Sequence, residues 1–304
     1  MTERLYFDDA YLREWMARVV ARGERDGRPV VALDRSAFYP EAGGQPGDQG
    51  MLDGVRVLDT QAEGEVVWHF LDAPLAADEV RATLDWERRF LFMQQHHGQH
   101  LLSAALDRLF EARTLSAHLG EEVCTVEIDS PGLGAEELAE TEELTNQVVW
   151  QNLPIHARFV DRAELASIPL RKPPGDYPRI RIVSAGDFDH TPCGGTHPRY
   201  TGEVGMVVVR RWERRGETLR VEYVCGARAL RDYRRKNALL NRLAADLSVG
   251  IADVPVAVER IRAAEERGRR ALAAAEEQLV VYEAAELLGA AERINDVPVV
   301  VRQW

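Results

Sequence analysis

Hydrophobic and polar residues alternate in short runs along the first ninety residues of the chain. Alternation with a period of two is typical of half-buried β-strands. The runs occupy residues 15–20, 29–33, 55–58, 66–71 and 80–86. Residues 38–50 hold four glycines and two prolines, so no regular element is expected to run through them. The pattern predicts a small β-barrel or sandwich that carries a long glycine-rich loop.

From residue 88 the hydrophobic period changes to that of a helix. Phe90, Met93, His97, Leu101 and Ala104 follow one another at spacings of three and four, which predicts an amphipathic helix over residues 88–110. An acidic helix is expected at residues 134–150. Further strands are expected at residues 122–128, 155–160, 180–183, 205–212 and 218–224. Mixed strands and helices of this kind predict an α+β second domain.

The pattern is again helical from residue 227 onward. Helices are expected at residues 227–247 and 254–288, and the second carries a heptad-like seam that Glu265 and Gly268 interrupt. Such a weak seam favours a helical hairpin or a homodimer through the C-terminal helices over a long coiled coil. A last strand at residues 297–301 either begins a shortened domain or pairs with another segment.

These elements predict an α+β fold with an N-terminal small β-barrel, an α/β two-layer domain and a C-terminal helical region. The expected domains are 1–90, 91–226, 227–288 and 289–304, the last being the start of a truncated C-terminal domain. A length of 304 residues agrees with about two compact domains.

Composition and charge narrow the class of protein. Lys and Arg number 38 against 50 Asp and Glu, which gives a net charge of −12 and argues against non-specific coating of nucleic acid. A local basic face remains compatible with this charge. No apolar run approaches the ~20 residues that span a bilayer, and the three cysteines are too few for a disulfide framework. We therefore expect a cytoplasmic protein with reduced thiols and no membrane partner.

The most specific chemical signal is a combination of two ligand pairs. His96 and His100 are four residues apart on the predicted helix, so both imidazoles lie on one face. Cys193 and His197 flank a Gly-Gly-Thr turn that lets the backbone bend tightly. Three imidazoles and one thiolate are a donor set typical of zinc, so we predict a Zn²⁺ site formed by these four residues.

Neighbouring histidines offer alternatives at this site. His190 lies three residues before Cys193 and competes as a ligand, whereas His97 is one step round the helix and is expected to point elsewhere. Four protein ligands are typical of a structural zinc, but the pairs come from separate elements of one sizeable domain, which favours a role in ligand binding. No glutamate lies within the histidine pair, as a metalloprotease helix would require.

The motifs around the ligand pairs resemble the editing domain of alanyl-tRNA synthetase and its free-standing relatives, the AlaX-type alanyl-tRNA editing proteins. The loop at residues 37–46 is similar to that of the barrel that precedes this domain. The other matching segments, in family order, are residues 96–102, 115–122, 179–183, 186–188, 193–197 and 201–205. The resemblance covers residue 1 to about residue 226. Residues 284–304 resemble only the beginning of the glycine-rich C-terminal domain of longer relatives.

This resemblance implies a trans-editing enzyme, an aminoacyl-tRNA hydrolase that removes serine, and also glycine, from mischarged tRNA(Ala). The zinc would be held by His96, His100, Cys193 and His197. No aminoacylation domain precedes the barrel, so editing is expected on tRNA released by another protein. A pocket for alanine rejects glycine and serine only by limited factors, which explains the need for a second site.

The resemblance also suggests residues for substrate binding. Thr114 is the candidate that binds the serine hydroxyl, and His118, where many synthetase editing domains have glutamine, is a candidate substrate-facing group. Ordinary strand positions are the alternatives for both. Gly43, Gly44 and Gln45 are expected to form a lid or to touch the acceptor stem, with a tight structural loop as the alternative. Arg210 and Arg211 are candidates for phosphate contacts, with a solvated charged face as the alternative.

Two other functions agree with the same residues. In the first, the domain is a non-catalytic tRNA-binding module in which zinc only stabilises the fold. In the second, the site deacylates a different mischarged tRNA, such as seryl-tRNA(Thr). Assays on separate amino-acid esters and on separate tRNA species distinguish these functions.

Overall fold

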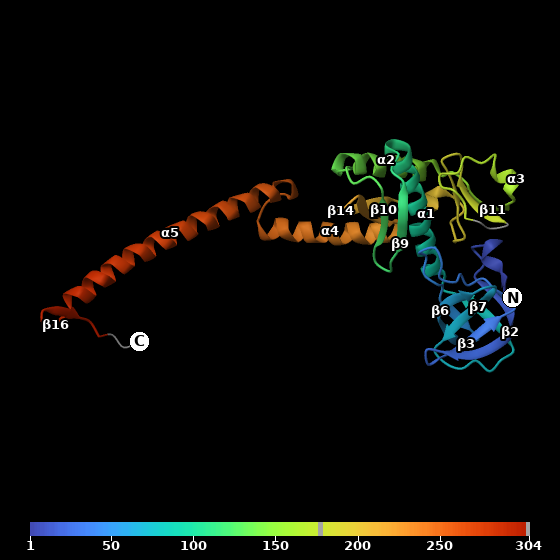
Figure 1. Ribbon diagram of the computed structural model, residues 1–304, viewed down its shortest axis with the longest axis horizontal. Helices are drawn as coiled ribbons and strands as arrows, with labels where there is room; N and C mark the ends of the chain where they lie inside the picture. Colours follow the sequence, from blue (N-terminus) through green and yellow to red (C-terminus); the bar gives the residue numbers. More distant parts are fainter. Residues whose placement is uncertain (176–178, 302–304) are drawn as a thin grey trace. The chain divides into compact units, whose positions relative to one another are not determined.

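The computed structural model describes residues 1–175 and 179–301. The chain divides into two compact units, Met1–Asp232 and Tyr233–Trp304 (Figure 1). The strands and helices together confirm the α+β class predicted from the sequence.

Six antiparallel strands near the N-terminus pair in a ring. Their order is β2-β3-β7-β6-β5-β8, and β8 pairs back with β2, so the ring is a closed barrel. Inside it lie apolar side chains that include Trp15, Phe38 and Leu52. The strands are β2 (Glu14–Arg25), β3 (Arg28–Leu33), β5 (Gly50–Leu52), β6 (Val55–Glu63), β7 (Val66–Leu71) and β8 (Glu79–Leu84). Two further strands, β1 (Glu3–Arg4) and β4 (Arg35–Ser36), have two residues each. They pair in parallel and form a separate small sheet that is not part of the barrel.

Strand β5 was not predicted from the sequence, because it has only three residues and the first of them, Gly50, belongs to the glycine-rich loop. A Cβ atom at Gly50 would lie 2.1 Å from the carbonyl oxygen of Thr83 on β8. Glycine at this position therefore allows β5 to pair closely with β8 and close the ring.

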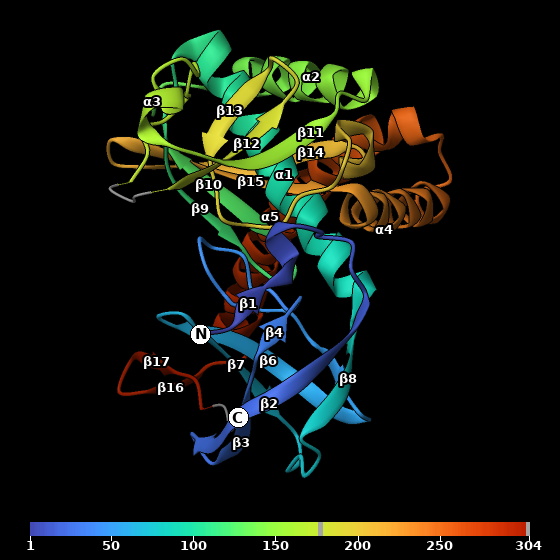
Figure 2. The same cartoon turned by 90° about the vertical axis from the view of Figure 1, so that its right-hand side faces the viewer.

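Helix α1 (Trp86–Phe110) connects the barrel to the rest of the first unit. It begins after Asp85, whose side chain accepts a hydrogen bond of 3.0 Å from the Arg88 N–H. The sequence predicted an amphipathic helix, but every residue from 92 to 106 is buried. The prediction of an exposed face was wrong, since α1 contacts β9, β10 and β15 on one side and β13 and α2 on others (Figure 2).

Two antiparallel sheets pack around α1. The four-stranded sheet has the order β14-β15-β10-β9, and the three-stranded sheet has the order β11-β12-β13. The strands are β9 (Thr114–Leu119), β10 (Cys124–Ile128), β11 (Ile155–Val160), β12 (Ile180–Ala185), β13 (Asp189–Pro192), β14 (Val207–Arg215) and β15 (Thr218–Cys225). Helices α2 (Ala135–Gln151) and α3 (Arg162–Leu165) complete this part. The edge strands β9 and β13 both contact α1, which sets up the candidate site.

The second unit consists of helices and one small hairpin. Helix α4 (Gly226–Asp246) begins in the first unit, and α5 (Val254–Gly289) is a continuous helix of 36 residues. The predicted C-terminal strand pairs locally, because β17 (Val297–Val299) forms an antiparallel hairpin with β16 (Glu292–Ile294). Within the described ranges, no helix combines the length and the apolar character needed to cross a membrane.

Candidate metal centre and adjoining cavity

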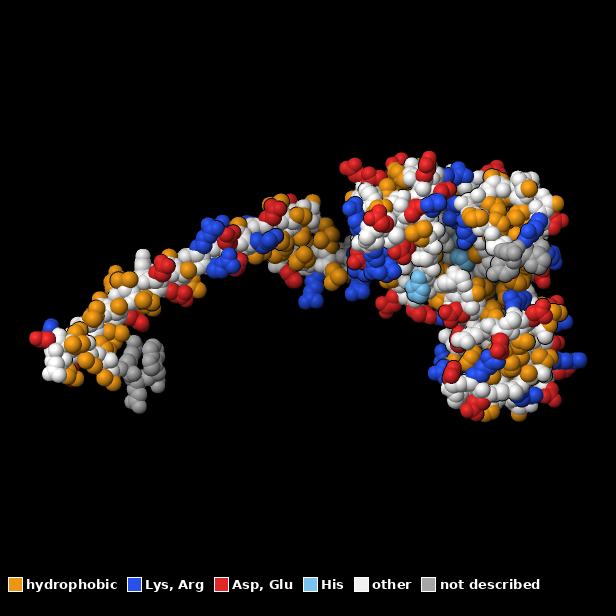
Figure 3. Space-filling view, viewed as in Figure 1, with side chains coloured by type: hydrophobic (Ala, Val, Ile, Leu, Met, Phe, Trp, Pro, Cys, Tyr) orange, Lys and Arg blue, Asp and Glu red, His pale blue; other side chains and the backbone are white. Residues whose placement is uncertain are grey.

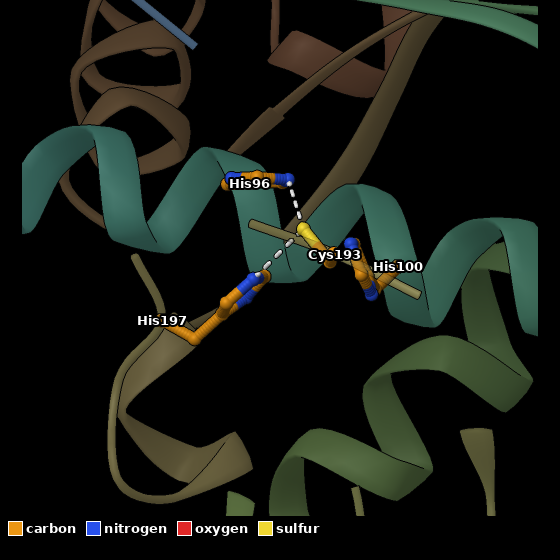
Figure 4. A group of neighbouring side chains, drawn as sticks. All are labelled: His96, His100, Cys193 and His197. Atoms are coloured by element: carbon orange, nitrogen blue, oxygen red, sulfur yellow. Dashed lines mark hydrogen bonds between the residues drawn. The ribbon is translucent and has the colours of Figure 1, made fainter. Parts of the chain in front are cut away.

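The four predicted zinc ligands lie together. His96 and His100 are one turn apart on α1, and Cys193 and His197 lie on the segment that follows β13. One donor atom from each of the four side chains falls within 4.8 Å of the others. The Nε2 atoms of His96 and His197 lie 3.4 Å and 3.3 Å from the Cys193 sulfur (Figure 4). The juxtaposition predicted from the sequence is therefore confirmed, while the identity of the ion stays a prediction.

The spacing of the donors fits a tetrahedral zinc site. Zn–N bonds of about 2.0 Å and Zn–S bonds of about 2.3 Å place nitrogen and sulfur roughly 3.5 Å apart in a tetrahedron. The two nitrogen–sulfur distances given above are close to this value. His190 takes no part, because its Nδ1 atom lies 2.8 Å from the Ser184 hydroxyl and the residue is outside the donor group.

The environment shifts the pKa values of His96, His197 and Cys193 toward the forms that bind metal. Burial, assisted by the charges of Lys172 and Arg181, lowers the pKa of His96 to about 3. Burial likewise places the pKa of His197 well below its usual value. Burial opposes ionisation of the Cys193 thiol, but His100, the Gly195 N–H and Arg181 outweigh it and lower its pKa. Neutral imidazoles and a thiolate are the forms that coordinate zinc.

Each of the three histidine ligands has an outer partner on its Nδ1 side. Gln45 Oε1 lies 2.8 Å from His96 Nδ1, and Asp189 Oδ2 lies 3.4 Å from His100 Nδ1. The third partner is His97, whose Nδ1 lies 3.1 Å from His197 Nδ1. Such outer contacts fix the tautomer and the ring orientation of metal-binding histidines.

The positions of the His97 and Gln45 side chains therefore differ from those predicted from the sequence. His97 was expected to point elsewhere, as a packing or surface histidine. It is buried and lies outside the donor group, but its ring contacts His197 instead of pointing away from the site. Gln45 was expected in a lid or an RNA contact, but its side chain is fully buried, and its Nε2 donates to the Thr196 hydroxyl at 2.8 Å. For Gln45 the geometry agrees with the alternative, a tight structural loop.

Arg181 stabilises the turn between Cys193 and His197 through hydrogen bonds to its backbone. Its Nη1 donates to the carbonyl oxygens of Cys193 and Gly195, at 3.0 Å and 2.8 Å. A Cβ atom at Gly195 would lie 2.2 Å from His96 Cε1, so only glycine allows the turn to approach α1 this closely. The residues between the two ligands thus set the distance between the ligand pairs.

A cavity of about 350 Å³ adjoins the metal centre and includes three of the four ligands in its lining. One wall is the first part of β9, from Thr114 to Ala117, and another contains Tyr39, Ala42 and Gly43 from the glycine-rich loop. Arg171 and Lys172 add positive charge to the lining, and Gln99 adds an amide. Sequence reasoning missed Gln99, although its position three residues after His96 places it on the same helix face.

Some of the other predicted site residues line this cavity, and others do not. Thr114 and Gly43 line it, whereas Gly44 packs behind, where a Cβ atom would meet the Ala117 carbonyl oxygen at 2.7 Å. His118 is exposed on β9, and the described residues that line the cavity do not include it. The role of His118 stays a prediction.

Arg210 and Arg211 lie on β14, at the opposite edge of the four-stranded sheet from β9. Both form ion pairs with Glu222, at 3.1 Å and 2.6 Å. Acidic and basic side chains are interspersed over the visible face of the first unit (Figure 3). Phosphate binding by Arg210 and Arg211 remains a prediction, and Glu222 would compete for both guanidinium groups.

Comparison with known proteins relates two parts of the chain to synthetase domains. Residues 180–221, which include Cys193 and His197, match the family described as the threonyl and alanyl tRNA synthetase second additional domain. Residues 13–88, which include the barrel strands, match the family of class II (A) tRNA synthetases.

Whole-chain comparison finds relatives with more specific names. The alanyl-tRNA editing protein AlaX-L of Pyrococcus horikoshii is 39% identical over 253 residues, which cover 77% of this chain and 62% of that protein. Aarsd1, an alanyl-tRNA editing protein of Rattus norvegicus, is 32% identical over 272 residues, 84% of this chain and 66% of that protein. Alanine–tRNA ligase of Pyrobaculum neutrophilum is 34% identical over 300 residues, 89% of this chain and 32% of the ligase.

These matches confirm the resemblance that the motifs predicted. Residues 180–221, which hold two of the four metal-site residues, are thus similar to the second additional domain of threonyl- and alanyl-tRNA synthetases. More narrowly, the chain is a relative of the alanyl-tRNA editing proteins. It spans less than two thirds of the length of each of these three relatives.

Proposed function

We propose that this protein hydrolyses the ester between serine and tRNA(Ala), and also the glycine ester, in the cavity beside His96, His100 and Cys193. The observation that carries the proposal is that three residues of a four-residue set of zinc donors, His96, His100 and Cys193, line a cavity that also contains polar and charged side chains. The names of the relatives, which are alanyl-tRNA editing proteins, support the choice of tRNA(Ala).

The dimensions and charge of the cavity suit an aminoacylated nucleotide terminus. Its volume of about 350 Å³ lies within the range of roughly 300–1,000 Å³ that small-molecule sites occupy. Lys172 provides positive charge for a phosphate of the acceptor end, whereas the Arg171 guanidinium is paired with Asp189 at 2.7 Å. The aminoacyl group would then lie between β9 and the metal ligands.

Hydrolysis of the ester requires water to add to the carbonyl carbon. The bond to the ribose oxygen then breaks, this oxygen takes one proton of the water and becomes a hydroxyl, and the amino acid leaves as its carboxylate while the second proton passes to solvent. A bound zinc would supply positive charge that orients and polarises the aminoacyl end. Because the chain itself offers four donors, its residues position the substrate more than they activate a metal-bound water.

Selection of serine over alanine is assigned in this proposal to Thr114. Its hydroxyl lines the cavity wall on β9 and can bond the serine hydroxyl, a group that alanine lacks. Sites that hydrogen-bond a substrate hydroxyl discriminate far more strongly than apolar pockets that only measure size.

The direct test compares seryl-, glycyl- and alanyl-tRNA(Ala) as substrates under identical conditions. We expect rapid release of serine, slower release of glycine and little release of alanine. Equal release of all three would refute selective editing, and faster hydrolysis of seryl-tRNA(Thr) would assign the site to another tRNA.

A second function, tRNA binding without catalysis, is favoured by one feature. Four protein donors complete a tetrahedron by themselves, as in structural zinc sites. In this case chelation would unfold the domain, which circular dichroism detects, and metal-loaded protein would bind tRNA without releasing any amino acid.

A further inference from the structure

Three polar side chains form a hydrogen-bonded chain beside the metal ligands. Gln99 Nε2 donates to the Ser103 hydroxyl oxygen at 2.7 Å, and the hydroxyl oxygens of Thr114 and Ser103 form a hydrogen bond of 2.6 Å. Gln99 and Thr114 line the cavity, while Ser103 is fully buried. Helix α1 and the strand that follows it, β9, thus meet at the Ser103 hydroxyl.

These bonds fix the position of the hydroxyl that Thr114 offers to the cavity. A hydroxyl group both donates and accepts, so Ser103 can bind the Gln99 amide and the Thr114 hydroxyl at the same time. The contact with Ser103 therefore restricts the rotation of the Thr114 side chain at the cavity wall.

We propose that Ser103 and Gln99 are positioning residues that hold the Thr114 hydroxyl in place, so that the cavity selects an aminoacyl group that carries a hydroxyl. The proposal rests on the proposed function, because it explains how the same cavity separates serine from alanine. The serine hydroxyl would form a hydrogen bond with Thr114 Oγ1. An alanine methyl group would instead leave the Thr114 hydroxyl without this partner, which penalises binding.

Glycine provides an internal control for this inference. A glycyl ester has no side chain, so its hydrolysis depends on the metal centre and on backbone contacts but not on the Thr114 hydroxyl. Loss of the chain of hydrogen bonds should therefore lower the rate for the seryl ester and leave the glycyl ester nearly unchanged. General damage to the fold or to the metal site would lower both rates together.

The experiment measures kcat/KM for seryl-, glycyl- and alanyl-tRNA(Ala) with the full chain and three variants, Ser103→Ala, Gln99→Met and Thr114→Val. We expect Ser103→Ala to lower the seryl value by about tenfold, the usual effect of one hydrogen bond, and to change the glycyl value less than twofold. Bound zinc should stay equal in all variants. Ser167→Ala serves as the matched control, because Ser167 is exposed and its hydroxyl bonds the Glu164 carbonyl oxygen outside the cavity.

Equal loss of seryl and glycyl hydrolysis in Ser103→Ala, with zinc retained, would overturn the inference. An unchanged seryl-to-alanyl ratio in both Ser103→Ala and Gln99→Met would overturn it as well. If the unaltered chain hydrolyses no ester, the proposed function fails separately. In that case the affinities for the non-hydrolysable analogues 3′-serylamino- and 3′-alanylamino-3′-deoxyadenosine test the inference. The inference requires that the unaltered chain bind the serine analogue more tightly and that Ser103→Ala abolish this preference.

Discussion

At the scale of single residues, the metal centre requires a residue as small as glycine at position 195. The backbone of Gly195 lies against the imidazole ring of His96, close to the Gln45 side chain whose Oε1 atom is 2.8 Å from His96 Nδ1. A side chain at this position must push His96 away from the Cys193 sulfur or lift the turn from α1.

We therefore predict that Gly195→Ala lowers zinc affinity at least about tenfold, the loss typical of a disturbed ligand orientation. The new Cβ would lie 2.2 Å from His96 Cε1. Gly194→Ala is the matched control, because a Cβ at Gly194 meets no atom within 4 Å, and it should keep its zinc. Competition with a chromogenic chelator measures both affinities. Equal zinc affinity in the two variants would contradict the assigned geometry.

At the scale of secondary-structure elements, a buried ion pair joins the glycine-rich loop to helix α1. The Arg89 guanidinium on α1 is fully buried and donates to Asp48 of the loop and to the carbonyl oxygen of Ala37. The same loop carries Gln45, which orients His96. The pair thus connects barrel geometry with the position of a metal ligand.

Arg89→Ala should destabilise the first unit by about 3–5 kcal/mol, because it leaves the Asp48 carboxylate buried without its partner. Urea unfolding followed by tryptophan fluorescence measures this change. The double variant Arg89→Met with Asp48→Asn removes both charges and should recover part of the loss. A change below ~1 kcal/mol in Arg89→Ala would contradict a buried, unscreened pair.

The barrel contains a second buried polar contact whose stability depends on pH. Burial lowers the pKa of His69 to about 4, and its Nε2 lies 2.8 Å from the Ser36 hydroxyl. The unfolded chain binds a proton at His69 below its usual pKa of about 6.5, whereas the folded chain does not until about pH 4. The contribution to stability is therefore complete above pH 6.5 and is lost as the pH falls toward 4.

Replacing His69 by glutamine should make the free energy of unfolding less dependent on pH. Between pH 6 and 4.5 the expected difference in slope from the unaltered chain approaches 1.4 kcal/mol per pH unit, the value for one proton. Urea titrations of both proteins at several pH values measure the slopes. Identical slopes would show that His69 titrates normally in the folded barrel.

The ligand set was predictable from sequence because helical spacing alone brings His96 and His100 to one face. The outer partners were not, since Gln45, His97 and Asp189 depend on how the loop, α1 and β13 meet in three dimensions. Long regular elements such as α1 and α5 were found within two residues of their ends. Strands β5 and β13 were missed, because three or four residues carry too little periodicity.

At the scale of the whole molecule, the C-terminal unit carries exposed apolar side chains on helix α5. Leu272, Leu279 and Tyr282 of the predicted heptad seam are 58% or more exposed on α5. Apolar side chains at coiled-coil spacing on one helix are typical of a surface that packs against another helix. A homodimer through the C-terminal helices therefore stays the prediction for the intact chain.

Sedimentation equilibrium of the full chain should show a dimer at micromolar concentration. The double variant Leu272→Glu with Leu279→Glu should be a monomer, because charge is introduced into the seam. Glu277→Gln, outside the seam on the same helix, should dimerise like the unaltered chain. A monomer at all concentrations of the unaltered chain would contradict the prediction.

The central claim is that His96, His100, Cys193 and His197 hold a zinc ion on which release of serine from seryl-tRNA(Ala) depends. The most direct measurement follows serine release by the protein as purified, after chelation, and after zinc is restored. We predict one zinc per chain, loss of serine release on chelation, and recovery with one equivalent of zinc while circular dichroism stays constant. Serine release that persists in fully metal-free, folded protein would contradict the account.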